Sequence, residues 1–343
     1  MQAVILAAGI STRTYPLTLT KPKPLLKAAN KTLLEHNLDA LKDAAKEIII
    51  VVGYKKEMIE DFLKNKYKNF KITFVEQKEQ LGTGHALLQA EKFIKGRFIL
   101  LMGDNIYSKQ DIKNISNYKC SILTKKEKNP GLFGVVVQNN SILADIVEKP
   151  KSFVSDIISC ALYAFDKKIF FLLKKVRKSK RGEYEITDAI KQLSMEEEIH
   201  CIESKQWLPI GYPWDLLEAD KILRNGKNLV GKNIKIDGKI ENSSVGNNCI
   251  IKGKIKNSIV MDDSIIDSSS IVEDSVIGEN VYFRGTAKSG NNVESIVKEK
   301  PVMVEKLGAI IADNVRAENV DIKPGCKIWP SKHIKGIINS DII

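Results

Sequence analysis

Residues 1–26 read MQAVILAAGISTRTYPLTLTKPKPLL, and this stretch decides how the first half of the chain is interpreted. Its apolar residues 3–7 predict a short buried strand. The strand runs into small residues that end at Gly9, where the backbone can approach a ligand closely. A turn of exposed backbone N–H groups at such a place forms a nest for anions, so a phosphate-binding loop is predicted here.

Two cations follow this turn and fit the same interpretation. Arg13 offers a bidentate contact and Lys23 a point charge, and both types of side chain neutralise polyphosphates. Pro22 and Pro24 stiffen the segment that presents Lys23. The loop is neither a Walker A loop nor a GxGxxG fingerprint, because neither spacing is present.

Outward from this stretch, strand and helix patterns alternate. The strand patterns lie at 47–52, 71–75 and 97–102, and the helix patterns lie at 32–45, 55–65 and 83–94. This order predicts βαβ units and an α/β fold, a Rossmann-like domain with a mostly parallel mixed sheet. Ligands of such sheets sit beyond the carboxyl ends of the strands.

The sequence pattern changes near residue 226, where helical patterns give way to short apolar pieces between turn-forming residues. We place the domain boundary here, between 1–226 and 227–343. Ile259, Ile265, Ile271 and Ile277 stand six residues apart, and Ile322, Ile328 and Ile334 repeat that spacing. A branched apolar residue at every sixth position predicts a hexapeptide-repeat β-helix, with this residue pointing inward. The stretch 287–300 breaks the period and is predicted to be an inserted loop.

Composition excludes several classes of protein. The 343 residues carry a net charge of +12, but the lysines are spread along the chain and mixed with acids, which argues against nucleic-acid binding. No apolar run approaches the roughly 20 residues of a membrane span. The five cysteines are scattered and form no CxxC pair, which favours a reducing cytoplasm over a disulfide framework.

Several motifs together resemble a known family. Residues 6–26 are similar to the opening LAAGxxTRxxPLTxxxPKPLL of the nucleoside triphosphate:sugar-1-phosphate nucleotidylyltransferases. The other motifs follow in family order: QLGTGHA at 80–86, GDN at 103–105, GVV at 134–136, EKP at 148–150, GEYEITD at 182–188 and PWDLLEA at 213–219. Together with its repeat tail, the chain looks most like the archaeal bifunctional nucleotidylyltransferase/acetyltransferases. This resemblance implies that the tail is a left-handed β-helix.

The resemblance implies transfer of a nucleotidyl group from UTP or dTTP to glucose-1-phosphate or N-acetylglucosamine-1-phosphate, in a cytoplasmic enzyme that forms trimers or larger homo-oligomers through the β-helix. It also implies roles for residues: Arg13 and Lys23 in catalysis; Leu6, Ala8, Gly9, Gln77, Gly82 and Thr83 at the nucleotide; Gly134, Glu148, Lys149 and Ser159 at the sugar phosphate; Asp104 and Asp215 as ligands of Mg²⁺.

Simpler interpretations exist for some of these residues. Asp104 could be a turn former, Asp215 a helix N-cap, and Glu148 with Lys149 an exposed ion pair. At the level of the whole chain, the alternative is a non-catalytic regulatory or assembly subunit of the same fold. The intact pairs Arg13 with Lys23 and Asp104 with Asp215 favour the enzyme.

Three departures from the family are visible. Ser11 replaces the usual glycine of the first loop, and Ser159-Cys160-Ala161 replaces Asn-Ala-Gly at the sugar. In the tail, residues 288–293 read KSGNNV where the bifunctional relatives have a histidine base. Acyl transfer loses a main contribution without that base, so the tail is predicted to be a trimerising scaffold without acetyltransferase activity. A bifunctional enzyme with residual acetyl transfer stays the alternative.

Overall fold

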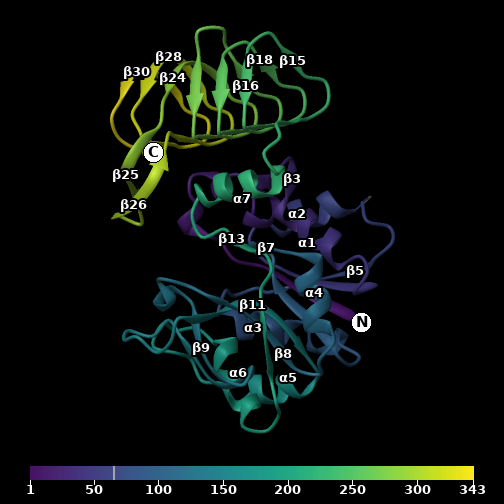
Figure 1. Cartoon of the computed structure of the whole chain (residues 1–343). Coiled ribbons are helices and arrows are strands. Elements are labelled where there is room, and N and C mark those ends of the chain that lie inside the picture. The colour runs from purple at the N-terminus through teal and green to yellow at the C-terminus, as the bar shows by residue number, and fades with distance from the viewer. Residues whose placement is uncertain (65) are drawn as a thin grey trace. The chain divides into compact units, whose positions relative to one another are not determined.

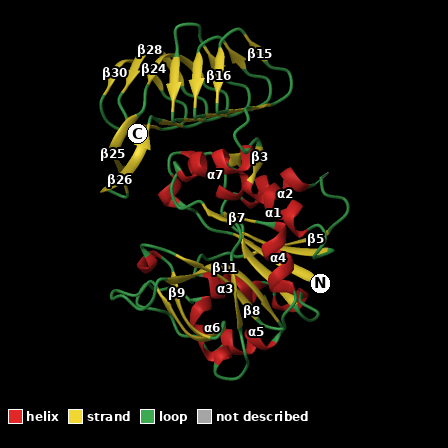
Figure 2. Cartoon of the chain, in the orientation of Figure 1, coloured by secondary structure: helices red, strands yellow, loops and turns green. Residues whose placement is uncertain are grey.

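The structure is a computed structural model that describes residues 1–64 and 66–343. It divides into two compact units. The first comprises 1–9 and 34–208, and the second comprises 10–33 and 209–343. Helices and strands are labelled in Figure 1 and coloured by type in Figure 2.

A nine-stranded mixed sheet forms the centre of the first unit. Its order is β5-β4-β1-β6-β11-β8-β12-β10-β9, and β5, β4, β1 and β6 are parallel. The strands are β1 Gln2–Ala7, β4 Glu47–Val52, β5 Lys71–Glu76, β6 Phe98–Met102, β8 Ser121–Lys126, β9 Gly134–Asn139, β10 Ile142–Glu148, β11 Ile157–Phe165 and β12 His200–Glu203. Two short strands, β7 Asn105–Tyr107 and β13 Trp207–Pro209, pair separately.

Helices pack around this sheet. They are α1 Leu33–Leu41, α2 Lys56–Leu63, α3 Thr83–Gln89, α4 Lys109–Ser116, α5 Lys168–Leu173 and α6 Ile186–Ser194. Apolar residues of β1, β6 and β11 form one core with those of α3, α5 and α6. The predicted helix 83–94 is shorter than expected, because α3 ends at Gln89 and a separate 3-10 turn follows at Glu91–Phe93. The helix predicted at 55–65 is α2, and Asn65 lies outside the described residues.

The parallel strands end together, as the sequence predicted. Register pairs Ala7 with Val52 and Val52 with Glu76, so β1, β4 and β5 finish at one edge. The backbone N–H of Gly103, just past β6, donates to the carbonyl of Leu6 over 2.8 Å. The turns after these strands are therefore side by side.

In the second unit, residues 10–33 hold three 3-10 turns, Thr12–Thr14, Leu17–Leu19 and Lys23–Leu25, and the hairpin of β2 Lys27–Ala28 with β3 Lys31–Thr32. Helix α7, Asp215–Arg224, follows the PWD motif. The chain then forms a left-handed β-helix of stacked parallel strands, which confirms the predicted fold class (Figure 1). Its strands are β14 Leu229–Val230, β15 Lys235–Ile236, β16 Lys239–Glu241, β17 Ser244–Val245, β18 Ile250–Ile251, β19 Lys254–Lys256, β20 Ile259–Val260, β21 Ile265–Ile266, β22 Ile271–Glu273, β23 Val276–Ile277, β24 Tyr282–Ala287, β27 Ile310–Ile311, β28 Arg316–Ile322, β29 Lys327–Ile328 and β30 His333–Ile338.

Two details of the repeat differ from the prediction. The residues that stack inside the coil at β20 to β22 are Val260, Ile266 and Val272, each fully buried, and not the isoleucines that precede them. Neighbouring residues of a strand face opposite sides, so a shift of one position exchanges inside and outside. The stretch predicted as an insertion loop begins a β-hairpin, in which β25 Gly290–Val297 pairs with β26 Lys300–Leu307.

Candidate functional site

The second unit brings together Arg13, Lys23 and Asp215. Lys23 lies in the 3-10 turn Lys23–Leu25, which follows Pro22 and is closed by the N–H of Leu26 donating to the Lys23 carbonyl over 3.0 Å. Arg13 lies in the 3-10 turn Thr12–Thr14 and is exposed, whereas Lys23 is only 3% exposed. The charges of both act on the Asp215 carboxylate.

The carboxylate of Asp215 is fixed by the backbone before it. The N–H groups of Gly211 and Tyr212 donate to its Oδ2 over 2.7 and 2.8 Å. Burial raises the pKa of this carboxyl above its usual value, while the two N–H groups and then Lys23 and Arg13 act to lower the pKa. Asp215 is the first residue of α7, and the N-cap is Trp214, so the simpler interpretation of Asp215 as an N-cap is one position off. Asp215 also lies in the field of two cations.

Aromatic side chains complete this cluster, and sequence reasoning missed them. The rings of Tyr212 and Trp214 stack at 5.0 Å and 11°. The guanidinium of Arg13 lies 5.7 Å from the centre of the Tyr212 ring, within the range of a cation–π contact. The motif spelling Tyr-Pro-Trp-Asp was the available signal, since it places two aromatic residues within three positions before Asp215.

Ser11 keeps the backbone geometry that a glycine would favour. Its φ is 57° and its ψ is 51°, in the left-handed region. Its carbonyl accepts hydrogen bonds from the hydroxyls of Thr14, at 2.7 Å, and Thr18, at 3.0 Å. These bonds hold the turn that carries Arg13, so the serine replaces the family glycine without unfolding the loop.

In the first unit, the predicted nucleotide segment packs on the GEYEITD motif. Gln77 follows β5, is 3% exposed, and donates from Nε2 to the carbonyl of Gly82 over 3.2 Å. The N–H of Gly84 donates to the Tyr184 carbonyl, and the N–H of Tyr184 donates to the carbonyl of Leu81. A Cβ on Gly82 would lie 2.7 Å from that Tyr184 oxygen, so this glycine gives room to Tyr184.

Thr83, the remaining residue of the predicted nucleotide segment, begins α3. Its Oγ1 accepts from the N–H of Ile186 over 3.3 Å. Leu6, Ala8 and Gly9 lie at the end of β1, and the carbonyl of Ala8 accepts from the N–H of Tyr54 over 3.1 Å. The predicted nucleotide residues of the first unit therefore all lie on the carboxyl edge of the parallel strands or in the loop beside it.

The predicted sugar-phosphate residues meet at the pair β9–β10. Gly134 and Glu148 are opposite each other in that pair, and a Cβ on Gly134 would lie 3.2 Å from Oε2 of Glu148. Burial raises the pKa of Glu148; Lys149 and Arg181 oppose this rise, and Glu185 adds to it. Arg181 reaches Glu185 at 2.7 Å and Glu148 at 3.4 Å. Arg181 was not singled out from the sequence, and Glu185 was singled out only as part of the GEYEITD motif.

Ser159 lies on β11 and is 5% exposed. Its hydroxyl is 3.0 Å from that of Tyr163 and accepts from the N–H of Ala161 over 3.1 Å. Ala161, which stands where the family has glycine, has a φ of 56° and so also keeps the left-handed geometry. The departure at 159–161 thus changes side chains and keeps the backbone.

The two predicted metal ligands belong to different units. Asp104 follows β6 at the carboxyl edge in the first unit, and Asp215 begins α7 in the second. Within residues 1–64 and 66–343, no three His, Cys, Asp or Glu side chains gather as a metal cage. Mg²⁺ typically takes one or two carboxylates together with substrate phosphates and water, so this donor set fits Mg²⁺. Their convergence on one ion stays a prediction.

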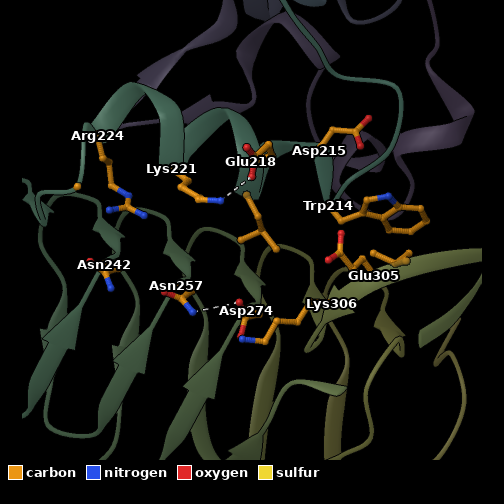
Figure 3. Close-up of a pocket in the computed structure, with 13 residues that line it drawn as sticks. Trp214, Asp215, Glu218, Lys221, Arg224, Asn242, Asn257, Asp274, Glu305 and Lys306 are labelled. Atoms are coloured by element: carbon orange, nitrogen blue, oxygen red, sulfur yellow. Dashed lines mark hydrogen bonds and ion pairs between the residues drawn. The ribbon is translucent and has the colours of Figure 1, made fainter. Parts of the chain in front are cut away.

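A groove of about 720 Å³ runs between α7 and the β-helix within the second unit (Figure 3). Trp214, Glu218 and Lys221 line it from α7 and the residue before it, and Glu305 and Lys306 line it from the hairpin. Its lysines are matched by acids: Lys221 lies 3.3 Å from Glu218, and Lys306 lies 3.0 Å from Asp274. The groove is therefore a poor receptor for a polyphosphate. In the described part of the chain, no helix is long and apolar enough to span a membrane.

Comparisons with known proteins give the following matches. A family model described as "Nucleotidyl transferase" matches residues 2–226. "Bifunctional protein GlmU" of Methanocaldococcus jannaschii is 38% identical, covering 96% of this chain and 92% of its own. "UTP--glucose-1-phosphate uridylyltransferase AglF" of Haloferax volcanii is 37% identical, covering 65% of this chain and 97% of its own. A crystal structure of a putative glucose-1-phosphate thymidylyltransferase from Bacillus anthracis, in complex with a sucrose, superposes with a TM-score of 0.60 at 28% identity, covering 66% of this chain and 96% of its own.

Proposed function

The chain belongs to the nucleotidyl transferase family, and from that premise we propose that it transfers a nucleotidyl group from UTP or dTTP to a sugar 1-phosphate. An oxygen of the sugar phosphate attacks the α-phosphorus, the bond to the pyrophosphate leaving group breaks, and a nucleotide-sugar and pyrophosphate result. The observation that carries the proposal is the cluster of Arg13, Lys23 and Asp215.

Each of these residues has a physical task in the reaction. Arg13 and Lys23 neutralise the triphosphate and stabilise the charge that develops as pyrophosphate departs. Glu148 accepts hydrogen bonds from sugar hydroxyls, and Lys149 pairs with the sugar phosphate. Gln77 reads the pyrimidine through its amide, which donates and accepts. Such chemistry depends on positioning and electrostatics more than on covalent help.

Asp104 and Asp215 together would hold Mg²⁺, which screens the phosphates when bound. The archaeal relative that is named for uridylyl transfer favours UTP over dTTP for this chain. The boundary between catalytic residues 1–226 and the tail at 227–343, a cytoplasmic location and a homotrimer formed through the β-helix belong to the same proposal. The tail lacks the histidine at 288–293, so acetyl transfer is not part of it.

The experiment is a substrate matrix: UTP or dTTP against glucose-1-phosphate and N-acetylglucosamine-1-phosphate, with pyrophosphate release as the readout. Turnover with Mg²⁺ and its loss with EDTA is the expected result. Nucleotide binding without turnover of any pair would instead support the non-catalytic subunit. Release of free CoA thiol from acetyl-CoA in the presence of glucosamine-1-phosphate would show that the tail has kept its second activity.

A further inference from the structure

The β-helix presents a row of acids, which we call the acid ladder: Asp262, Glu279 and Asp313. The strands β20, β23 and β27 are paired in register, and each acid stands two residues after the end of one of them. The strand ends Val260, Ile277 and Ile311 are the paired positions. The three side chains therefore occupy the same position in consecutive coils. Strands in one sheet lie about 4.8 Å apart, so like charges this close repel one another unless cations compensate.

The β-helix backbone orients the two aspartates of the ladder. Oδ1 of Asp262 accepts from the N–H of Asn247 over 2.9 Å, and Oδ1 of Asp313 accepts from the N–H of Glu279 over 2.8 Å. In both cases the bond is made to the preceding coil. Oδ2 of each aspartate contacts another segment, and Oδ2 of Asp262 also accepts from Nδ2 of Asn247 over 3.3 Å.

That other segment is residues 10–33, which carry Arg13 and Lys23. Nζ of Lys21 lies 2.7 Å from Glu279 and 3.0 Å from Asp313. Nζ of Lys27 lies 2.6 Å from Asp262 and 3.4 Å from Glu279. The Thr20 hydroxyl donates to Oδ2 of Asp313 over 2.6 Å. Every acid of the ladder thus contacts residues 10–33.

Burial makes these contacts consequential. The Lys21 side chain is 6% exposed and that of Asp313 is 7% exposed, so water screens this pair little. Removing Lys21 would leave the buried carboxylate of Asp313 without this cation. Burial acts to lower the pKa of Lys27, but Asp262 and Glu279 outweigh it and hold this pKa above its usual value.

The anchored lysines stand on either side of Lys23. Pro22 and Pro24 restrict the backbone between them, and the N–H of Leu25 closes the 3-10 turn on the carbonyl of Pro22 over 2.9 Å. A stiff segment fixed at both ends holds its middle residue in place. A displacement of about 1 Å in such a group can cost about 100-fold in rate.

We propose that Asp262, Glu279 and Asp313 are positioning residues for nucleotidyl transfer, which act by anchoring Lys21 and Lys27 so that Lys23 is held at the phosphates. The tail is then a working part of the transferase and not only an oligomerisation scaffold. This inference rests on the proposed function, in which Lys23 contacts the triphosphate.

The test is a double-mutant cycle in the full-length chain with Lys27→Met and Glu279→Gln, alone and together. We expect each single variant to lose about 10- to 100-fold in kcat and to raise the KM for the triphosphate at least about threefold, because Lys23 contacts the phosphates before and during the reaction. Lys27 and Glu279 belong to one network of ion pairs, in which Lys27 also contacts Asp262 and Glu279 also contacts Lys21. The double variant should therefore lose clearly less than the product of the two single losses. Glu279→Asp keeps the charge and should recover part of kcat.

A matched control separates positioning from stability. Lys327 is also buried, at 3% exposed, and lies 3.2 Å from Asp341, but both belong to the β-helix alone. Lys327→Met should lower Tm as much as the ladder variants and leave kcat within about threefold. Equal losses of kcat in both sets, or additive losses in the cycle, would overturn the proposal.

A binding experiment keeps this inference separate from the proposed function. If the wild-type chain turns over no substrate pair, the proposed function fails. Calorimetric titration with UTP and dTTP then measures whether the acid ladder affects the affinity for the triphosphate. Weaker triphosphate binding by Glu279→Gln than by Lys327→Met would support anchoring of the loop. Equal affinities of these two variants would overturn the inference by itself.

Discussion

The carbonyl oxygen of Tyr184 lies so close to Gly82 that a Cβ on this glycine would come within 2.7 Å of it. Gly82 also has a φ of 102° and a ψ of 174°, a region that is essentially restricted to glycine. The QLGTGHA and GEYEITD motifs are joined at this point, so the shape of the predicted nucleotide segment depends on both.

Replacement of Gly82 by alanine should therefore reduce activity and stability together. We expect a loss of about 1–3 kcal/mol in the free energy of unfolding, together with a raised KM for the nucleotide. Gly96→Ala is the matched control, because a Cβ there meets no atom within 4 Å. Chemical denaturation and initial rates measure both effects, and equal behaviour of the two variants would contradict this account.

Replacement of Lys23 by methionine should lower kcat by about 10²–10³, because it removes a charge that stabilises the departing pyrophosphate. Arg13→Lys keeps the charge and loses the bidentate fork, so a smaller loss of about tenfold is expected. Lys113→Met, at an exposed position on α4, serves as the control. Rates that stay within about threefold for Lys23→Met would remove Lys23 from the reaction.

The pH dependence of the reaction should respond to the neighbours of Glu148 in opposite directions. Burial raises the pKa of this carboxyl, so it loses its role as an acceptor at a higher pH than an exposed glutamate would. Arg181→Gln removes an opposing cation and should move the acid limb of kcat/KM for the sugar phosphate to higher pH. Glu185→Gln removes a like charge and should move that limb to lower pH.

The opposite signs of the two shifts are the diagnostic result. The substrate phosphate titrates identically in all three proteins, so the difference between the variants isolates Glu148. Two limbs that move in the same direction would exclude Glu148 as the titrating group.

Glycine at Ser11 or Ala161 should stabilise the fold slightly. Both residues have left-handed backbone angles, with φ of 57° and 56°. That conformation costs about 1–2 kcal/mol for a residue with a Cβ, and the extra freedom of glycine in the unfolded chain offsets about 0.5–1 kcal/mol of the gain. Ala164→Gly on the same strand β11 should instead destabilise the protein, and denaturant titrations of the three variants provide the comparison.

The fold class was predictable because its two periodicities are strong. Alternating strands and helices predicted the parallel core, and the six-residue spacing predicted the β-helix. The hairpin β25–β26 escaped prediction because its turn residues, Lys298 and Glu299, adopt φ of 49° and 64° without the usual Asn or Gly. Within β25, Val293, Ser295 and Val297 are buried and the residues between them are exposed. Because one of the buried residues is a serine, this alternation is weak in the sequence.

The candidate site residues were predicted from the sequence motifs, and the structure adds the residues that hold them in place. Arg13, Lys23 and Asp215 were predicted to act together, and they lie in one unit. The acid ladder was not predicted, because a lone acid in a β-helix turn resembles any other turn residue. Its members are recognised only when the coils are stacked in register, and the inserted hairpin hides that register in the sequence.

The composition of the second unit has a consequence for biosynthesis. Residues 10–33 belong to the same compact unit as residues 209–343, and they leave the ribosome first. At a synthesis rate of roughly 5–20 residues per second, they wait for about ten seconds or longer before their partners emerge. In a nascent chain, residues 10–33 therefore lack their ion-pair partners until translation is almost complete. A message truncated before the β-helix yields a polypeptide in which Lys21 and Lys27 have no acidic partners from the β-helix.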